Sequence, residues 1–260
     1  VVSSEQKIVI SSKEERNFDK QIRPKLFKEF IGQESLVKSL KTYIIAAEER
    51  HESLDHILLY GPPGLGKTTL ANIIANELKK GFSSSSGPVI SIPGDLSGML
   101  TNLQDRDVFF IDEIHRMQPQ IQETHYPAME DYKLDLPVGQ GPSADIIPVP
   151  LSRFTLTGAT TREGLLAAPF RDRFGIRVHL DYYTVEELKI AILQNSEKMN
   201  VEVDDEAQLE IGLRSRGTMR IAKNLLFNVR DYASVKYDGV VTKDIALEAL
   251  NFFQIDELGL

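Results

Sequence analysis

The sequence predicts an α/β protein in which a parallel sheet flanked by helices is followed by a small all-helical domain. As far as residue 182, short apolar segments with the character of strands alternate with amphipathic helical segments. This alternation favours a parallel sheet with helices on both faces. After Tyr183 the strand pattern fades, and Thr184, Asp204, Thr218 and Thr242 each stand where a side chain would cap a new helix.

The large domain is expected at residues 22–182, after a flexible arm at residues 1–21. Its strands are expected at residues 56–60, 89–92, 107–111, 154–158 and 177–180. Apolar spacing predicts helices over residues 34–50 and 68–78, and Gly81 would end the second of them. We interpret the serine-rich segment 83–88 as a flexible loop.

The small domain is expected at residues 183–255. Thr184 and Glu187 match a capping box at the start of its first helix. The later helices would run from Asp204 to about Ser215, from Thr218 to about Val235 and from Thr242 to Phe253.

A projecting hairpin is expected between the third and fourth strands. Residues 132–138 and 145–149 have the pattern of strands, and a longer loop at residues 139–143 joins them. The segment is rich in apolar residues for an exposed arm. Two interpretations remain open: ordinary core packing, or a docking surface for a partner.

Composition excludes several classes of protein. The chain has 260 residues, a formal net charge of −8 and no cysteine. An acidic chain is not a general nucleic-acid binder, so DNA contact would need a local patch, another subunit or a further segment. The sequence contains no apolar run of about 20 residues and no signal-peptide core. We therefore expect a cytoplasmic protein without a membrane association, disulfides or thiolate metal sites.

The most specific motif is a glycine-rich phosphate loop between a strand and a helix. Gly61, Gly64, Gly66 and Lys67 fall in a G-x-x-x-x-G-K-T pattern that ends at Thr68. Backbone N–H groups and the positive end of the following helix would converge on phosphate oxygens. The lysine would reach the outer phosphates and the threonine hydroxyl would coordinate Mg²⁺. The pattern predicts binding of a nucleoside triphosphate.

Two carboxylates follow the apolar strand at residues 107–111. Asp112 would hold Mg²⁺ through water, and Glu113 would polarise the attacking water. The pairing favours hydrolysis over a pure nucleotide switch. Thr161, at the end of the next strand, would orient that water or sense the γ-phosphate, although by itself it also fits a plain strand end. His115 is given no role.

Two arginines that lie far from the phosphate loop in the sequence are candidates for contact with the nucleotide. Arg173 lies beside a glycine turn and could serve a neighbouring subunit's nucleotide, or it could belong to a surface ion pair with its neighbours. Arg220 falls in the first turn of a predicted helix, where the dipole disfavours a cation. That position suggests an outside anion such as the γ-phosphate.

Together these motifs resemble the AAA+ ATPases, and the chain is similar to the RuvB family of Holliday-junction branch-migration motors from about Ile22 to its last residue. The motifs that carry the resemblance are Arg23-Pro24, Phe30 to Gln33, Gly61 to Thr69, Gly94 to Leu96, Leu100 to Leu103, Asp112 to Arg116, Tyr126 to Asp131, Gly158 to Arg162, Arg171 to Ile176, Ser215 to Arg220 and Asp256 to Leu260.

The resemblance implies an AAA+ P-loop ATPase with a small all-helical lid and assigns a role to each site residue. Lys67, Thr68 and Thr69 hold ATP phosphates and Mg²⁺, while Asp112 and Glu113 serve metal and water. Thr161 becomes sensor 1, Arg173 the finger that acts in trans and Arg220 sensor 2. Ile22, Arg23 and Tyr183 would line the adenine side of the site. Glu130, Asp131 and Tyr132 would lie near contacts with the nucleotide or with a neighbouring subunit.

The resemblance also implies an assembly. Six copies would ring one duplex arm of a four-way DNA junction, and the hairpin would dock a RuvA-type junction-recognition protein. A junction resolvase is a further candidate partner. In the family, residues 256–260 lead into a winged-helix domain that carries the main DNA contacts; the sequence stops there, so we expect weak hydrolysis that DNA stimulates poorly.

Two alternative functions remain open at this point. One is a clamp-loader-like or protein-remodelling ATPase on the same scaffold, which the hairpin's partner would distinguish. The other is a nucleotide-gated assembly module that oligomerises without useful turnover, which ATPase rates of active-site variants would distinguish.

Overall fold

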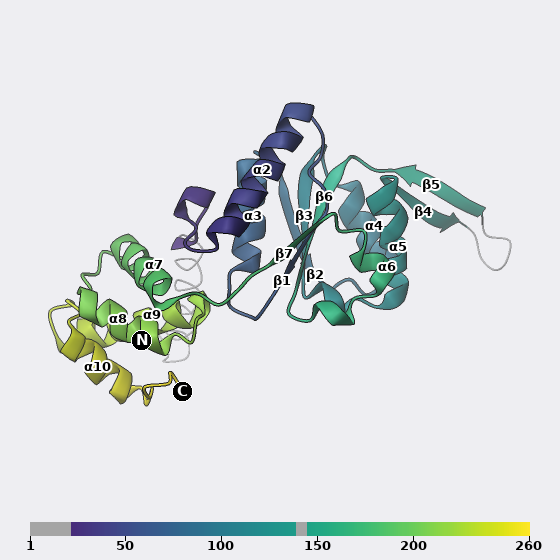
Figure 1. Cartoon of the computed structure of the whole chain (residues 1–260). Coiled ribbons are helices and arrows are strands. Elements are labelled where there is room, and N and C mark those ends of the chain that lie inside the picture. Colours follow the sequence, from purple (N-terminus) through teal and green to yellow (C-terminus); the bar gives the residue numbers. More distant parts are fainter. Residues whose placement is uncertain (1–21, 139–144) are drawn as a thin grey trace, which may run out of the picture. The chain divides into compact units, whose positions relative to one another are not determined.

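A computed structural model describes residues 22–138 and 145–260, apart from the side chains at 136–138, 145 and 146. The arm predicted for residues 1–21 and the hairpin loop at 139–144 lie outside the described residues. The described chain forms two compact units (Figure 1). One comprises residues 32–182, and the other joins residues 183–260 to the segment that precedes residue 32.

The first unit is built on a sheet of five parallel strands in the order β2-β3-β6-β1-β7. Its strands are β1 (Ile57–Tyr60), β2 (Phe82–Ser86), β3 (Asp107–Asp112), β6 (Phe154–Thr160) and β7 (Ile176–His179). The inner strands β1, β3 and β6 are almost wholly buried, as expected for a parallel sheet covered on both faces. The predicted α/β fold class is confirmed.

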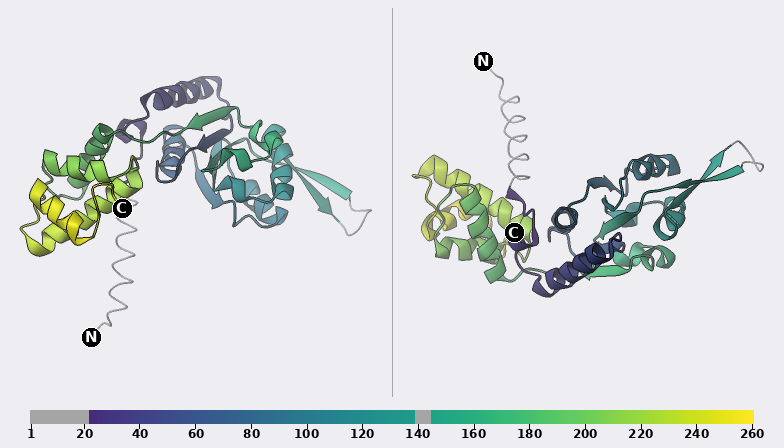
Figure 2. Two further views of the ribbon diagram at one scale, coloured as in Figure 1. Left: turned by 60° about the horizontal axis from the view of Figure 1, so that its bottom comes forward. Right: turned by 90° about the horizontal axis from the view of Figure 1, so that it is seen from above.

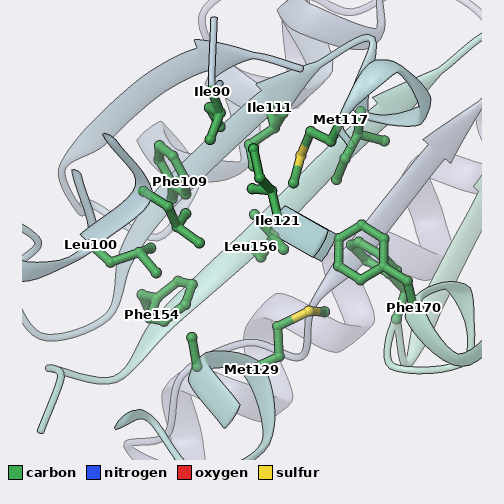
Figure 3. Close-up of a cluster of buried hydrophobic side chains, with 14 of the residues drawn as sticks. Ile90, Leu100, Phe109, Ile111, Met117, Ile121, Met129, Phe154, Leu156 and Phe170 are labelled. Carbon is green, nitrogen blue, oxygen red and sulfur yellow. The ribbon is translucent and has the colours of Figure 1, made fainter. Parts of the chain in front are cut away.

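Helices pack on the two faces of this sheet (Figure 1), with α3 on one side and α4 and α5 on the other. They are α2 (Glu34–Arg50), α3 (Lys67–Glu77), α4 (Pro93–Thr101), α5 (Pro119–Glu130) and the short α6 (Ala168–Arg171). Figure 3 shows part of the core cluster of buried side chains, to which Phe109, Leu156 and Phe170 belong. Burial of such side chains stabilises the unit by about 1.5–3 kcal/mol each.

Residues 89–92 were expected to form a strand, and this prediction is wrong. Val89 and Ile92 are exposed, and the Asp95 carboxylate accepts hydrogen bonds from the Ser91 and Ile92 N–H groups, each at 3.1 Å, at the start of α4. The second strand lies instead in the serine-rich segment that we interpreted as a loop. Because β2 is an edge strand, Ser83 and Ser84 can face solvent while Phe82 stacks on Phe110 of β3 at 6.0 Å.

The predicted end of α3 is confirmed to within one residue, but the role given to Gly81 is wrong. The helix ends at Glu77, and Lys79 takes the left-handed conformation, with φ of 53°, that we had expected of Gly81. The N–H of Gly81 instead donates to Asp107 Oδ1 at 2.8 Å, at the start of β3. Gly81 therefore joins two strand ends rather than ending a helix.

The predicted hairpin is present as β4 (Lys133–Val138) and β5 (Asp145–Pro150), an antiparallel pair that extends away from the sheet (Figures 1 and 2). Leu134 is fully buried and Val149 packs against the core cluster. Ile147 is 48% exposed. The core interpretation is confirmed for the base of the hairpin, and the docking surface stays a prediction that would involve the exposed Ile147.

The second unit contains α7 (Val185–Lys198), α8 (Asp205–Arg214), α9 (Met219–Lys236) and α10 (Lys243–Phe252). All four predicted caps are confirmed by bonds from a backbone N–H to the capping side chain. An isolated bridge between Val203 and Val241 is the strand-like feature that the sequence did not predict. Within the described ranges, no helix combines the length and the apolar character needed to cross a membrane.

Candidate nucleotide-binding site

Three strand ends bring the predicted phosphate and acidic motifs to one edge of the sheet. Tyr60 of β1 pairs in register with Thr160 of β6, and Ile111 of β3 pairs with Gly158. Because all these strands are parallel, the segments that follow them leave from the same edge. The phosphate loop, the paired carboxylates and Thr161 therefore meet there, where open α/β sheets bind ligands.

The phosphate loop depends on glycine for its shape. Gly61, Gly64 and Gly66 have φ values of 141°, 83° and 95°. Residues other than glycine rarely adopt such positive φ values. A Cβ on Gly61 would also overlap the Leu180 carbonyl oxygen of the neighbouring strand's end. The loop then leads directly into α3, whose first residues are Lys67, Thr68 and Thr69.

Lys67 is buried inside the curve of this loop. Its Nζ donates to the carbonyl oxygens of Gly61 and Pro62, each at 2.8 Å. A buried ammonium must be compensated, and phosphate oxygens would satisfy it at least as well as these carbonyls. Thr68 and Thr69, on the first turn of α3, are half-buried.

Asp112 and Glu113 lie at the C-terminal end of β3, as predicted. The Glu113 N–H donates to Asp112 Oδ1 at 2.9 Å, and Glu113 takes a left-handed conformation with φ of 48°. The turn is fixed from the neighbouring edge strand, because the N–H of Gly87 donates to the Asp112 carbonyl oxygen at 2.8 Å. The Glu113 side chain keeps 36% of its surface exposed, so it remains accessible to water.

A contact that the sequence did not predict joins Glu113 to the end of β6. His115 Nε2 lies 3.4 Å from Glu113 Oε2, and His115 Nδ1 lies 2.9 Å from Thr160 Oγ1. The Thr160 hydroxyl also accepts a hydrogen bond from the Arg162 N–H at 2.9 Å. Thr161 lies between Thr160 and Arg162 in the sequence and is half-buried. Only the closeness of His115 to Glu113 in the sequence could have hinted at this contact.

Arg173 follows α6 and is held within its own unit. Its guanidinium lies 3.1 Å from Glu130 Oε1 and 4.0 Å from the centre of the Tyr126 ring. Both partners belong to α5, and burial of Phe174 anchors the turn. Nearby, Asp131 pairs with Lys133 at 3.0 Å, and the Tyr132 hydroxyl lies 3.1 Å from Ser53 Oγ.

The remaining predicted residues belong to the helical unit. Ile22 and Tyr183 are buried there; the Ile22 carbonyl accepts from Lys198 Nζ at 3.0 Å, and the Tyr183 N–H donates to the Gly217 carbonyl at 2.9 Å. Burial raises the pKa of the Tyr183 hydroxyl. Arg23 is exposed, and Arg220 is exposed in the first turn of α9, where we expected it.

The residues present fit a magnesium-bound nucleotide. In the part of the chain that the structure describes, no group of three or more His, Asp or Glu side chains gathers as a protein-only metal site. Magnesium in nucleotide sites needs no such group, because it takes one or two protein ligands together with phosphate oxygens and water. One hydroxyl from Thr68 and one carboxylate from Asp112, beside a glycine cradle, meet that requirement.

A parallel sheet with a phosphate loop after β1, paired carboxylates after β3 and a helical lid defines the AAA+ class of P-loop proteins. The family models narrow this class. Residues 22–180 match the model of the Holliday junction DNA helicase RuvB P-loop domain, and residues 183–256 match that of the RuvB AAA lid domain. The chain belongs to the RuvB family.

Individual relatives agree with the family models. The chain is 50% identical over 250 residues to the Holliday junction branch migration complex subunit RuvB of Koribacter versatilis, which covers 96% of this chain and 69% of the relative. The structure of the Thermotoga maritima RuvB Holliday junction branch migration motor is similar with a TM-score of 0.83 at 47% identity, covering 92% of this chain and 75% of that one. A mutant of the same Thermotoga maritima protein gives a TM-score of 0.84 at 48% identity, over 92% of this chain and 76% of that chain.

Proposed function

We propose that this chain binds and hydrolyses ATP as the motor subunit of a Holliday junction branch-migration complex. The observation that carries the proposal is the meeting of the phosphate loop, the paired carboxylates and Thr161 at one edge of the sheet. Membership of the RuvB family supplies the substrate, since the similar proteins are named as branch-migration subunits and motors. The clamp-loader-like alternative is not favoured, because both matching family models describe RuvB domains.

Binding of the triphosphate rests on the loop and on α3. The loop N–H groups and the positive end of the helix dipole face the phosphates. Lys67 exchanges its two carbonyl partners for phosphate oxygens, and the Thr68 and Thr69 hydroxyls contact phosphate and metal. The Lys67 ammonium is already aimed into the loop, so little ordering of its side chain remains to be done on binding.

Hydrolysis rests on the two carboxylates. Thr68 and Asp112 would hold a Mg²⁺ ion, which would neutralise the charge that develops on the phosphate oxygens. Glu113 orients and polarises the attacking water, and its side chain is exposed enough for water to reach the carboxylate. Thr161 follows the neighbouring strand β6, and its hydroxyl donates a hydrogen bond to the same water or to the γ-phosphate.

Residues outside this cluster complete the site. Arg173 acts on the nucleotide of a neighbouring subunit, and Glu130 and Tyr126 hold its guanidinium when it is not so engaged. Glu130, Asp131 and Tyr132 form the adjoining subunit contact. The Arg220 side chain has no hydrogen bond or ion pair among the described residues, which suits a sensor that meets an external γ-phosphate. Ile22, Arg23 and Tyr183 enclose the adenine.

The assembly follows from a shared active site. A finger that serves the neighbour's nucleotide requires a head-to-tail interface, and six such interfaces would close a ring around duplex DNA. The exposed part of the hairpin, at Ile147, is the surface for a RuvA-type partner. A junction resolvase would join the same complex.

A substitution pair tests the hydrolytic assignment. In Glu113→Gln, which keeps size and hydrogen bonding but removes the charge, kcat should fall by about 100-fold or more, while calorimetry should still detect ATP with magnesium. Glu123→Gln makes the same chemical change at an exposed position of α5 and should leave kcat unchanged. Equal rates for Glu113→Gln and wild type would overturn the proposal, as would wild-type protein that neither turns over ATP nor, with a RuvA-type protein, migrates a synthetic four-way junction.

A further inference from the structure

The side chain of His115 occupies a position between two parts of the nucleotide site. It belongs to the 3-10 turn Ile114–Arg116, directly after Glu113, and only 8% of its side-chain surface is exposed. One ring nitrogen faces the Glu113 carboxylate at 3.4 Å, and the other faces the Thr160 hydroxyl at 2.9 Å. The imidazole thus spans the gap between the turn after β3 and the end of β6.

The hydrogen-bond partners allow a direction of this bridge in which His115 donates toward Glu113. Thr160 Oγ1 accepts from the Arg162 N–H and keeps its own O–H, which donates to His115 Nδ1 in the arrangement that we propose below. A neutral imidazole that accepts at Nδ1 carries its proton at Nε2. In that tautomer the Nε2–H is on the nitrogen that lies 3.4 Å from Glu113 Oε2, and hydrogen bonds donated in turn by Arg162, Thr160 and His115 would lead to the carboxylate.

We propose that His115 is a positioning residue for Glu113 and that it links the Glu113 carboxylate to the segment 160–162, which carries Thr161. The inference rests on the proposed function, since it concerns the orientation of the group that polarises water. The carboxylate is otherwise free to rotate, because its backbone bond to Asp112 fixes the main chain but not the side chain. A donor at Nε2 selects one orientation of the carboxylate and leaves its other oxygen for water.

The same bridge reaches the phosphate loop. The carbonyl oxygen of Thr160 accepts from the N–H of Gly61, the first residue of that loop, at 3.3 Å. Thr160 therefore contacts the loop through its main chain and His115 through its side chain. The support that we propose for Glu113 is therefore anchored beside the phosphate loop.

Packing alone is the competing explanation, and it predicts different behaviour. A histidine that only fills space would affect folding stability when truncated, and its effect on turnover would not depend on Thr160. A histidine that positions Glu113 affects kcat much more than ATP affinity. Removal of either end of the bridge would then cost nearly the same as removal of both, since they act as one unit.

The kinetic test uses His115→Ala, Thr160→Val and the double variant, with Arg116→Ala and Thr160→Ser as matched controls. Arg116 is an exposed neighbour in the same turn, and serine keeps the hydroxyl. We expect kcat to fall by about 10- to 100-fold in both single variants, the dissociation constant for ATP to stay within about threefold, and the double variant to lose no more than about threefold beyond the worse single one. His115→Gln, which keeps a neutral donor, should recover part of kcat.

A second measurement needs no turnover. Nitrogen NMR of the histidine rings in the nucleotide-free protein should show His115 as the neutral tautomer protonated at Nε2, and Glu113→Gln should move its Nε2 resonance more than Arg116→Ala does. The inference is overturned if the proton is at Nδ1, or if His115→Ala keeps wild-type kcat while Glu113→Gln abolishes it. Additive losses in the double variant would also overturn it. Wild-type protein without ATPase activity would instead overturn the proposed function.

Discussion

Substitution of Gly87 by alanine should impair hydrolysis from a position outside every recognised motif. Gly87 follows the edge strand β2, and its N–H holds the Asp112 carbonyl at 2.8 Å. An added Cβ would overlap the Glu113 carbonyl oxygen and lie 3.2 Å from the Met117 N atom. The turn that carries Glu113 would have to move away from β2.

The structure sets the size of the effect. Restoring an ordinary contact requires a shift of the Glu113 carbonyl by between roughly half an ångström and one ångström. Misplacement on this scale costs about 100-fold in rate when it moves a catalytic group, and overpacking costs about 1–3 kcal/mol of folding free energy. The phosphate loop belongs to another strand, so ATP affinity should change by no more than about threefold.

Steady-state turnover at saturating ATP and magnesium, calorimetric ATP binding and urea unfolding separate these effects. Gly98→Ala is the matched control, because its added Cβ meets no atom within 4 Å and the residue lies inside α4. That variant should keep its turnover and gain about 0.5–1 kcal/mol in folding free energy. If Gly87→Ala retains a kcat within twofold of wild type, then the contact from β2 does not position Glu113 and the reasoning fails.

Two further predictions concern a buried histidine and the shared active site. Burial lowers the pKa of His125 to about 4 from 6.5, so the unfolded chain binds more protons between those values and the folded state loses stability as pH falls. The free energy of unfolding should drop by about 2 kcal/mol between pH 7 and pH 5 on this account. Urea titrations of His125→Gln should lack that component, and an unchanged pH dependence would count against it. Lys67→Ala and Arg173→Ala subunits, each inactive alone, should regain part of the ATPase activity when mixed, and a mixture as inactive as its parts would argue against a finger that acts in trans.

The secondary structure was predictable where local chemistry decides it. The helix at residues 34–50 and the strand ends near Tyr60 and Ile111 are confirmed, because apolar periodicity and turn residues act within a few positions of the chain. All four caps of the helical unit are likewise confirmed. Residues 83–92 were predicted wrongly because the outcome depends on an edge position in the sheet, where polar serines are tolerated and Phe82 has a partner on β3.

The sequence by itself determined the phosphate loop, the two carboxylates after an apolar strand and the separation of a sheet domain from a helical one. Each of these follows from residues that are neighbours in the chain. Tertiary structure alone decided that His115 meets Thr160, 45 residues away, that Glu130 and Tyr126 hold Arg173, and that Gly87 supports the turn of Glu113. Such contacts depend on strand order and register, which arise from burial across the whole sheet and leave no periodic signal in the chain.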